Sequence, residues 1–218
     1  MEYFLAPIVA VPKSLQHIKD LNVTIGTFCR AVHHTKNGDL IVGSSCSIAL
    51  YDGNFTKLYS TGRETSSNVC SVMQQKDGTI LAFFSNGTLL TLSPSLEKRK
   101  ETPTGGYKKS ALSGNILTIC GPNITGMKLF NIQTNNHRTY SIPGSGQIHS
   151  VCTHPDEDIC LLDAKNSKVR KYRIYEEMGP QLVWECNGVE QGYAICCDEQ
   201  GLTYVSAAGK KVYVINSG

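Results

Sequence analysis

The sequence repeats one pattern five times: a polar turn, a short apolar run, a second turn and a second apolar run. One turn residue per repeat marks the spacing, at intervals of 40, 36, 44 and 43 residues: Gly38, Gly78, Gly114, Asp158 and Gly201. A period near forty residues with several strands in each repeat is typical of the blades of a β-propeller. The pattern therefore predicts an all-β propeller of five blades, in which the loops on the two faces of a disc would carry the function.

Each repeat can be divided into four antiparallel strands, lettered A to D from the centre of the disc outwards. The fifth repeat ends after its C strand at residues 212–215, and the segment 17–23 has the pattern of a D strand that belongs to no blade. An N-terminal strand that completes the last blade removes two exposed edges. We therefore expect residues 17–23 to pair with residues 212–215, with 1–16 as an extension or linker and 17–218 as the propeller. These assignments fit a closed five-bladed ring and also five blades of a six-bladed propeller.

Composition narrows the class of protein. Charged residues make up 18% of the 218 residues, below the usual quarter, and the net charge of +3 is too small to indicate nucleic acid by itself. The nine cysteines lie mostly in apolar strand segments, without the C-x-x-C spacing of a zinc or redox site. We expect reduced, buried thiols, no disulfide bond and a cytoplasmic location. Residues 1–12 lack the features of a signal peptide and are too short to span a membrane.

Short motifs in the first repeat resemble a known family. Cys-Arg-Ala-Val at 29–32, Gly-Asp-Leu-Ile-Val at 38–42 and Ile-Ala-Leu-Tyr-Asp-Gly at 48–53 are similar to the A, B and C strands of an NHL repeat. The second and fifth repeats carry parts of this pattern, whereas the third and fourth depart from it. The version resembled most is the propeller at the C-terminus of invertebrate tripartite-motif (TRIM) proteins. That resemblance implies a domain that recognises substrates for a ubiquitin ligase whose catalytic RING lies outside this chain.

The sequence shows no catalytic constellation. Its six histidines form no H-E-x-x-H motif, and there is no G-x-S-x-G elbow, P-loop or paired-carboxylate arrangement. His149 begins an A strand and could reach the central channel, where lyases of the NHL-like type bind metal, but a single histidine does not make a site. We therefore expect no catalytic residue, no metal, no cofactor and no small-molecule substrate. The acidic segment Asp156-Glu157-Asp158 is interpreted as a solvated turn, and Trp184 as packing between blades.

Charge is unevenly divided between the two expected faces. The face built from the B–C and D–A connections carries seven basic residues against three acidic ones, whereas acidic residues dominate the A–B and C–D turns. Aspartate is common in tight turns because its side chain bonds the local backbone, which explains much of the acidic face. The basic face has no such explanation, and aromatic residues accompany it. The candidate partner-binding residues are Phe28, Arg63, Tyr107, Lys108, Lys109, Lys165, Lys168, Tyr193, Lys210 and Lys211.

Two partner classes fit cations that alternate with aromatic side chains. The leading interpretation is a non-catalytic module that docks an acidic protein partner on the basic face. The alternative is a single-stranded RNA reader that uses the same face, since bases stack on aromatic rings and phosphates pair with lysine. A propeller lyase or esterase would need ligands or a nucleophile that the sequence does not supply. A five-bladed lectin would need the same pocket residues in every blade, and the loops differ too much for that.

Overall fold

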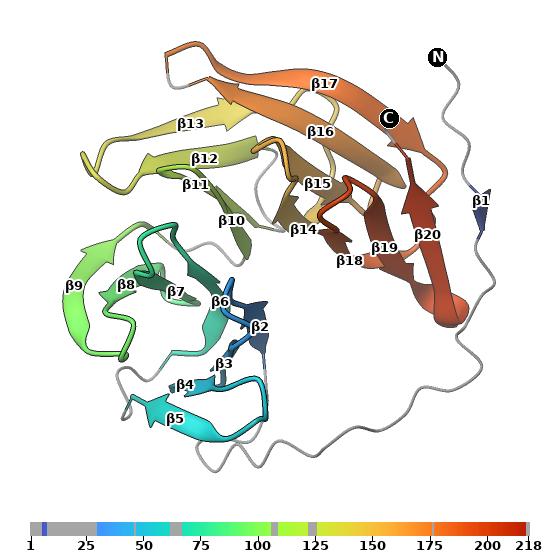
Figure 1. The fold of residues 1–218 in the computed structure, drawn as a ribbon. Helices are drawn as coiled ribbons and strands as arrows, with labels where there is room; N and C mark the ends of the chain where they lie inside the picture. Colours follow the sequence, from blue (N-terminus) through green and yellow to red (C-terminus); the bar gives the residue numbers. More distant parts are fainter. Residues whose placement is uncertain are drawn as a thin grey trace. The chain divides into compact units, whose positions relative to one another are not determined.

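The computed structural model describes residues 6–7, 30–45, 47–61, 67–105, 109–121, 126–175 and 177–216. The strands form five four-stranded antiparallel sheets (Figure 1). The fold is all-β, a β-propeller of five four-stranded blades, as the forty-residue period predicts. Contacts divide the chain into two compact units, residues 16–108 and residues 1–15 together with 109–218.

The unit of residues 16–108 holds the first two blades. Blade 1 consists of β2 (Ala31–His34), β3 (Leu40–Gly43), β4 (Ile48–Tyr51) and β5 (Lys57–Ser60). Blade 2 consists of β6 (Val69–Gln74), β7 (Ile80–Phe84), β8 (Thr88–Leu92) and β9 (Lys98–Pro103). A shared core that includes Ile41, Phe84 and Leu90 fills the space between the two sheets. The two sheets approach each other closely at Gly43, where an added Cβ would lie 2.5 Å from Cγ1 of Val69.

The other unit holds the remaining three blades. Blade 3 consists of β10 (Lys109–Ser113), β11 (Ile116–Cys120), β12 (Gly126–Asn131) and β13 (His137–Ser141). Blade 4 consists of β14 (Ile148–Thr153), β15 (Ile159–Asp163), β16 (Lys168–Tyr175) and β17 (Gly179–Asn187). Blade 5 consists of β18 (Gly192–Cys197), β19 (Thr203–Ala207), β20 (Lys211–Ile215) and β1 (Ala6–Pro7). The A strand β14 packs against both neighbouring A strands, β10 and β18.

Two apolar layers separate these three blades. One lies between blades 3 and 4 and includes Met127, Ile148 and Leu161, and the other lies between blades 4 and 5. Trp184, on the outer strand β17, is only 6% exposed and belongs to the second layer, so the expectation that it packs between blades is confirmed. Among the described residues the only helical element is the 3-10 turn η1 (Ala208–Lys210), and none of their helices is long and apolar enough to cross a membrane.

The last blade is completed by a strand from the start of the chain, but not by the expected one. Ala6 and Pro7 of β1 pair antiparallel with Val214 and Tyr213 of β20. The segment 17–23, which we expected in this place, lies outside the described residues. The place beside β20 is occupied by β1, within the segment 1–16 that we expected to be an extension or linker.

One A–B turn recurs in four blades. The backbone N–H of its first residue donates to the carbonyl four residues later, at Thr35, Gln75, His154 and Asp198. The fourth turn residue adopts a left-handed conformation, with φ of 88°, 86° and 86° at Gly38, Gly78 and Gly201. In blade 4 this position is Glu157, with φ of 67°. The residue that replaces the turn glycine is therefore Glu157 and not Asp158, which lies one position further along.

Candidate functional site

The strand registers of blades 3 to 5 place the D–A and B–C connections at one end of each sheet. In blade 4, Asp163 at the end of β15 pairs with Ile148 at the start of β14 and with Lys168 at the start of β16. In blade 5, Ala207 pairs with both Gly192 and Lys211. The start of each A strand, the end of each B strand and the start of each C strand therefore share one end, which we call the lysine end.

The structure describes half of the ten candidate residues in full. Phe28, Arg63, Tyr107 and Lys108 lie outside the described residues, as does the side chain of Lys210. The remaining five all belong to the lysine end of blades 3 to 5: Lys109, Lys165, Lys168, Tyr193 and Lys211. Lys109 begins β10, Lys165 lies in the β15–β16 loop and Lys211 begins β20.

Three of these lysines are exposed, and the fourth is held in an ion pair. Lys109, Lys165 and Lys211 are exposed, and within the described part of the chain none of them forms a salt bridge. Lys168 is half-buried, and its Nζ lies 2.6 Å from Oε1 of Glu185. Glu185 also accepts a hydrogen bond from Nε of Arg170 at 2.6 Å. Lys168 therefore serves the packing of blade 4, and the free positive charge of this end comes from the other three lysines.

Tyr193 is presented to solvent by an irregularity in β18. The pairing of β18 with β19 shifts between Gly192 and Ala194, which leaves Tyr193 as the extra residue of a bulge. A bulge bends its strand and redirects the side chain of the extra residue, and Tyr193 is 62% exposed. The same shift occurs in β14 around His149, a half-buried residue at the equivalent place in blade 4. Val212, at the start of β20, adds a second exposed apolar side chain at 43%.

The opposite end of blade 4 holds a partly buried charge network. Asp156 and Glu157 are exposed, as expected for a solvated turn, but the expectation is wrong for Asp158. Asp158 is only 2% exposed and accepts hydrogen bonds from Nε and Nη2 of Arg173 at 3.0 and 3.2 Å. Lys171, 5% exposed, lies between Asp156 and Asp158. Burial acts to raise the pKa of Asp156, but hydrogen bonds from Lys171, the Asp158 backbone and His154 lower it overall. Asp156 and Asp158 are therefore paired with Lys171 and Arg173 inside the blade.

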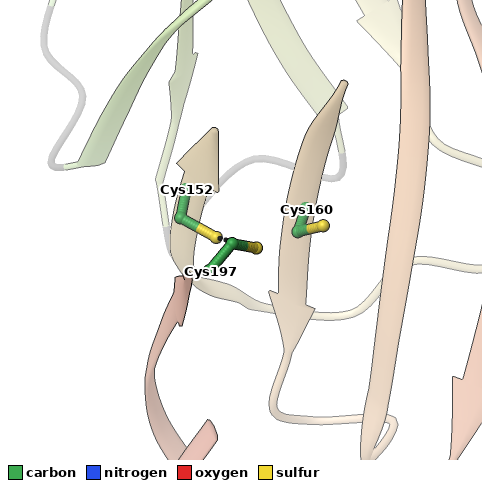
Figure 2. Close-up of side chains that lie close together, drawn as sticks. All are labelled: Cys152, Cys160 and Cys197. Carbon is green, nitrogen blue, oxygen red and sulfur yellow. Dashed lines mark hydrogen bonds between the residues drawn. The ribbon is translucent and has the colours of Figure 1, made fainter. Parts of the chain in front are cut away.

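Three cysteines converge where blades 4 and 5 pack, which sequence reasoning did not foresee. The sulfurs of Cys152, Cys160 and Cys197 all lie within 4.8 Å of one another, and those of Cys152 and Cys197 are 3.4 Å apart (Figure 2). Thiols from two different blades therefore come together at this junction. The described cysteines are free thiols. Hydrogen bonds from Cys152 and Cys160 lower the pKa of Cys197. The pKa of Cys152 is raised, because its thiol donates to Cys160 and Cys197 and would lose both hydrogen bonds on ionisation.

A pocket of about 130 Å³ lies in the same unit, between blades 3 and 4. It is lined by apolar residues of β11, β12 and β16 and by polar residues around the β12–β13 turn, among them Asn131, His137 and Arg138. The guanidinium of Arg138 donates to the carbonyl oxygen of Glu177 at 3.1 Å. None of the five candidate residues that the structure describes in full lines this pocket.

Comparisons with known proteins bear on the fold. No protein-family model matches the sequence, and no curated protein matches it. The structure is similar to the WD40 propeller domain of Doa1, with a TM-score of 0.67 at 15% identity over 84% of this chain, and to the WD40 domain of Neurospora crassa Pan2, with a TM-score of 0.67 at 14% identity over 87%. A streptogramin B lyase is similar at a TM-score of 0.68 and 12% identity over 86% of this chain.

These likenesses place the chain among β-propellers and go no further. The chain spans 62%, 63% and 64% of the Doa1, Pan2 and lyase chains, respectively. One fold that includes WD40 domains and a lyase hosts different functions, so the function of this chain has to be argued from its own residues.

Proposed function

We propose that this chain is a non-catalytic protein-binding module that docks an acidic segment of its partner on the lysine end of blades 3 to 5. The observation that carries the proposal is the position of Tyr193. Its aromatic ring is 62% exposed on a bulge, at the same strand ends as three exposed lysines. Exposed aromatic residues with a polar, charged surround are typical of protein interfaces. The lysines would steer a negatively charged partner and fix its orientation.

The balance of apolar and charged groups favours a protein over single-stranded RNA. Stacking platforms for RNA present successive aromatic rings along a basic groove. Among the described residues of the lysine end, Tyr193 is the exposed aromatic, and its apolar companion is Val212. An aliphatic side chain offers no stacking surface for a base, but it contributes to a protein interface. Single-stranded RNA therefore remains the second candidate, and a test must separate it from the first.

The finer assignment rests on the NHL-like motifs of the first repeat. If the resemblance to tripartite-motif proteins holds, the lysine end selects substrates for a ubiquitin ligase whose catalytic RING lies outside this chain, and the protein acts in the cytoplasm. A protein partner carrying an acidic segment would then be the substrate or an adaptor.

Affinity capture with charge-reversed baits tests the proposal. The test bait carries Lys165→Glu and Lys211→Glu, and the matched control carries Lys36→Glu and Lys76→Glu, two exposed lysines in A–B turns. Substitutions of exposed side chains cost within about 0.5 kcal/mol of stability, so both baits should stay folded. We expect proteins captured by the wild type and the control to be lost from the test bait, before and after ribonuclease treatment. Equal capture by all baits would refute the docking site, and loss after ribonuclease alone would assign the surface to RNA.

A further inference from the structure

The cysteine trio comes from three strands and two blades. Cys152 on β14 and Cys160 on β15 are direct partners in the register of blade 4. Cys197 comes from β18, the inner strand of blade 5 that packs against β14. Figure 2 shows the sulfur of Cys152 directed at Cys197, with Cys160 on the adjacent strand. Three sulfur atoms thus meet at a junction between blades, two of them from one hairpin and the third from a strand distant in sequence.

The surroundings of the trio offer sulfur and little else as a ligand. Cys160 is fully buried and belongs to the apolar layer between blades 4 and 5, while Cys152 and Cys197 are half-buried beside it. The hydroxyl of Thr203 lies 3.3 Å from the sulfur of Cys197. His154 directly follows β14, but its Nδ1 lies 2.5 Å from Oδ1 of Asp156 and its Nε2 lies 3.1 Å from the Gly201 carbonyl oxygen. Both ring nitrogens already have partners.

The sulfur spacing suits a single ion held by three thiolates. Thiolates are soft ligands that favour Cu⁺ and Zn²⁺. For metal–sulfur bonds of about 2.3 Å, three sulfurs arranged in a triangle around an ion lie roughly 4 Å apart. The trio, with one pair at 3.4 Å and all sulfurs within 4.8 Å, needs only small side-chain movements to reach that arrangement. Zinc sites in proteins are almost always four-coordinate, and the described residues supply three ligands.

We propose that Cys152, Cys160 and Cys197 form a site for a soft monovalent cation, Cu⁺, bound by three thiolates at the junction of blades 4 and 5. Each thiol that is still protonated releases its proton to solvent as its sulfur–metal bond forms. The half-buried Cys152 and Cys197 give the ion a path from solvent, and the buried Cys160 closes the inner side. The bound ion would link blade 4 to blade 5 and stabilise the folded state by mass action. This site is separate from the lysine end and does not depend on the proposed docking function.

Competition against a chromophoric Cu⁺ chelator tests the site in the reduced, full-length chain under anaerobic conditions. The test variant is Cys197→Ser, and the matched control is Cys196→Ser, the neighbour on the same strand, which points to the other face and is exposed. We expect the wild type and Cys196→Ser to retain one Cu⁺ per chain. Cys197→Ser should bind more weakly by more than the roughly 10–100-fold that loss of a second-sphere partner costs. Equal retention by the two variants would overturn the proposal.

Two further measurements separate a metal site from a folding defect and from other chemistry. Cys186→Ala alters a buried cysteine of the same apolar layer outside the trio. It should keep full Cu⁺ retention, and its loss of binding would show that the assay reports packing instead of ligation. X-ray absorption of the loaded protein should show three sulfur neighbours. Retention of Zn²⁺ in preference to Cu⁺, or a Cys152–Cys197 disulfide that forms in place of metal uptake, would each refute the assignment.

Discussion

At the scale of single residues, Glu185 links the packing of blade 4 to pH. A hydrogen bond from Lys168 is the main cause that lowers the pKa of Glu185; burial opposes it, and Arg170 adds to the lowering. A carboxylate with a lowered pKa in the folded state stabilises the protein above its ordinary pKa of about 4.3, and this contribution is lost as the pH falls through the folded value. The ion pair therefore contributes at neutral pH and disappears in acid.

Glu185→Gln tests this linkage. The variant should be less stable than the wild type at neutral pH, because Arg170, itself buried, then keeps only Asp163 as an anionic partner. The difference in the free energy of unfolding should shrink as the pH falls below about 4. Urea denaturation across that range measures it. A difference that is independent of pH would mean that Glu185 acts through packing and not through its charge.

The buried Asp158 is the second residue whose substitution should lower the stability of the protein. Asp158→Asn removes the charge that faces Arg173 and Lys171, and we expect a loss of about 1–3 kcal/mol in the free energy of unfolding. We do not expect the larger loss of stability that follows when a fully buried ion pair is broken. Lys171 keeps its ion pair with Asp156, and the Arg173 side chain is 50% exposed. Glu199→Gln, at an exposed position in the equivalent turn of blade 5, is the control and should change stability little. Equal stability of the two variants would contradict a structural role for the network.

At the scale of the element, the A–B turn explains what the sequence could and could not predict. Glycine at three of the four equivalent turn positions made the repeat visible and placed the strands around it. Glu157 occupies the left-handed position without being glycine. The alignment of the repeats was therefore wrong by one residue in blade 4, where Asp158 was taken as the equivalent of the turn glycine. A backbone conformation that only the tertiary fold imposes leaves no signal in residue type.

The bulge at Tyr193 and the cysteine trio also depend on tertiary structure that the sequence pattern does not reveal. Tyr193 could be placed on the D–A connection by counting strands, but its exposure depends on a register shift that no local motif announces. Cys152 and Cys160 flank the A–B turn of blade 4 evenly, so their pairing could have been read from the hairpin. The position of Cys197 beside these two cysteines depends on how blade 5 packs against blade 4, which strand assignment alone does not determine.

Glu157→Gly should stabilise blade 4. A left-handed backbone destabilises the folded state by about 1–2 kcal/mol at a non-glycine residue, and glycine removes this strain. Glycine also gives the unfolded chain more conformational freedom, which offsets about 0.5–1 kcal/mol of the gain. We expect a gain of up to about 1 kcal/mol, measured by urea denaturation. Gly201→Ala is the reciprocal variant and should destabilise, since its φ is 86° and its Cβ would lie 3.2 Å from His154. A loss of stability in Glu157→Gly would show that contacts of the glutamate side chain outweigh the backbone strain.

At the scale of the whole molecule, function is expected at one end of the blades, while the charge network lies at the other. Once a partner is identified, Tyr193→Ala should weaken it by about 2 kcal/mol or more if Tyr193 is a central interface residue. Tyr59→Ala removes a tyrosine that is 49% exposed on the outer strand of blade 1 and should leave binding unchanged. Isothermal titration calorimetry measures both, and equal effects would place the interface elsewhere.

The pairing of β1 with β20 also has a consequence for how the chain is made. Ala6 and Pro7 leave the ribosome before the other described strands, whereas their partners Val214 and Tyr213 emerge after them. Blades 1 to 4 are each built from consecutive strands, so they can assemble in the order of synthesis. Blade 5 can be completed only after Val214 has been released, and until then β1 lacks the strand with which it pairs in the folded protein.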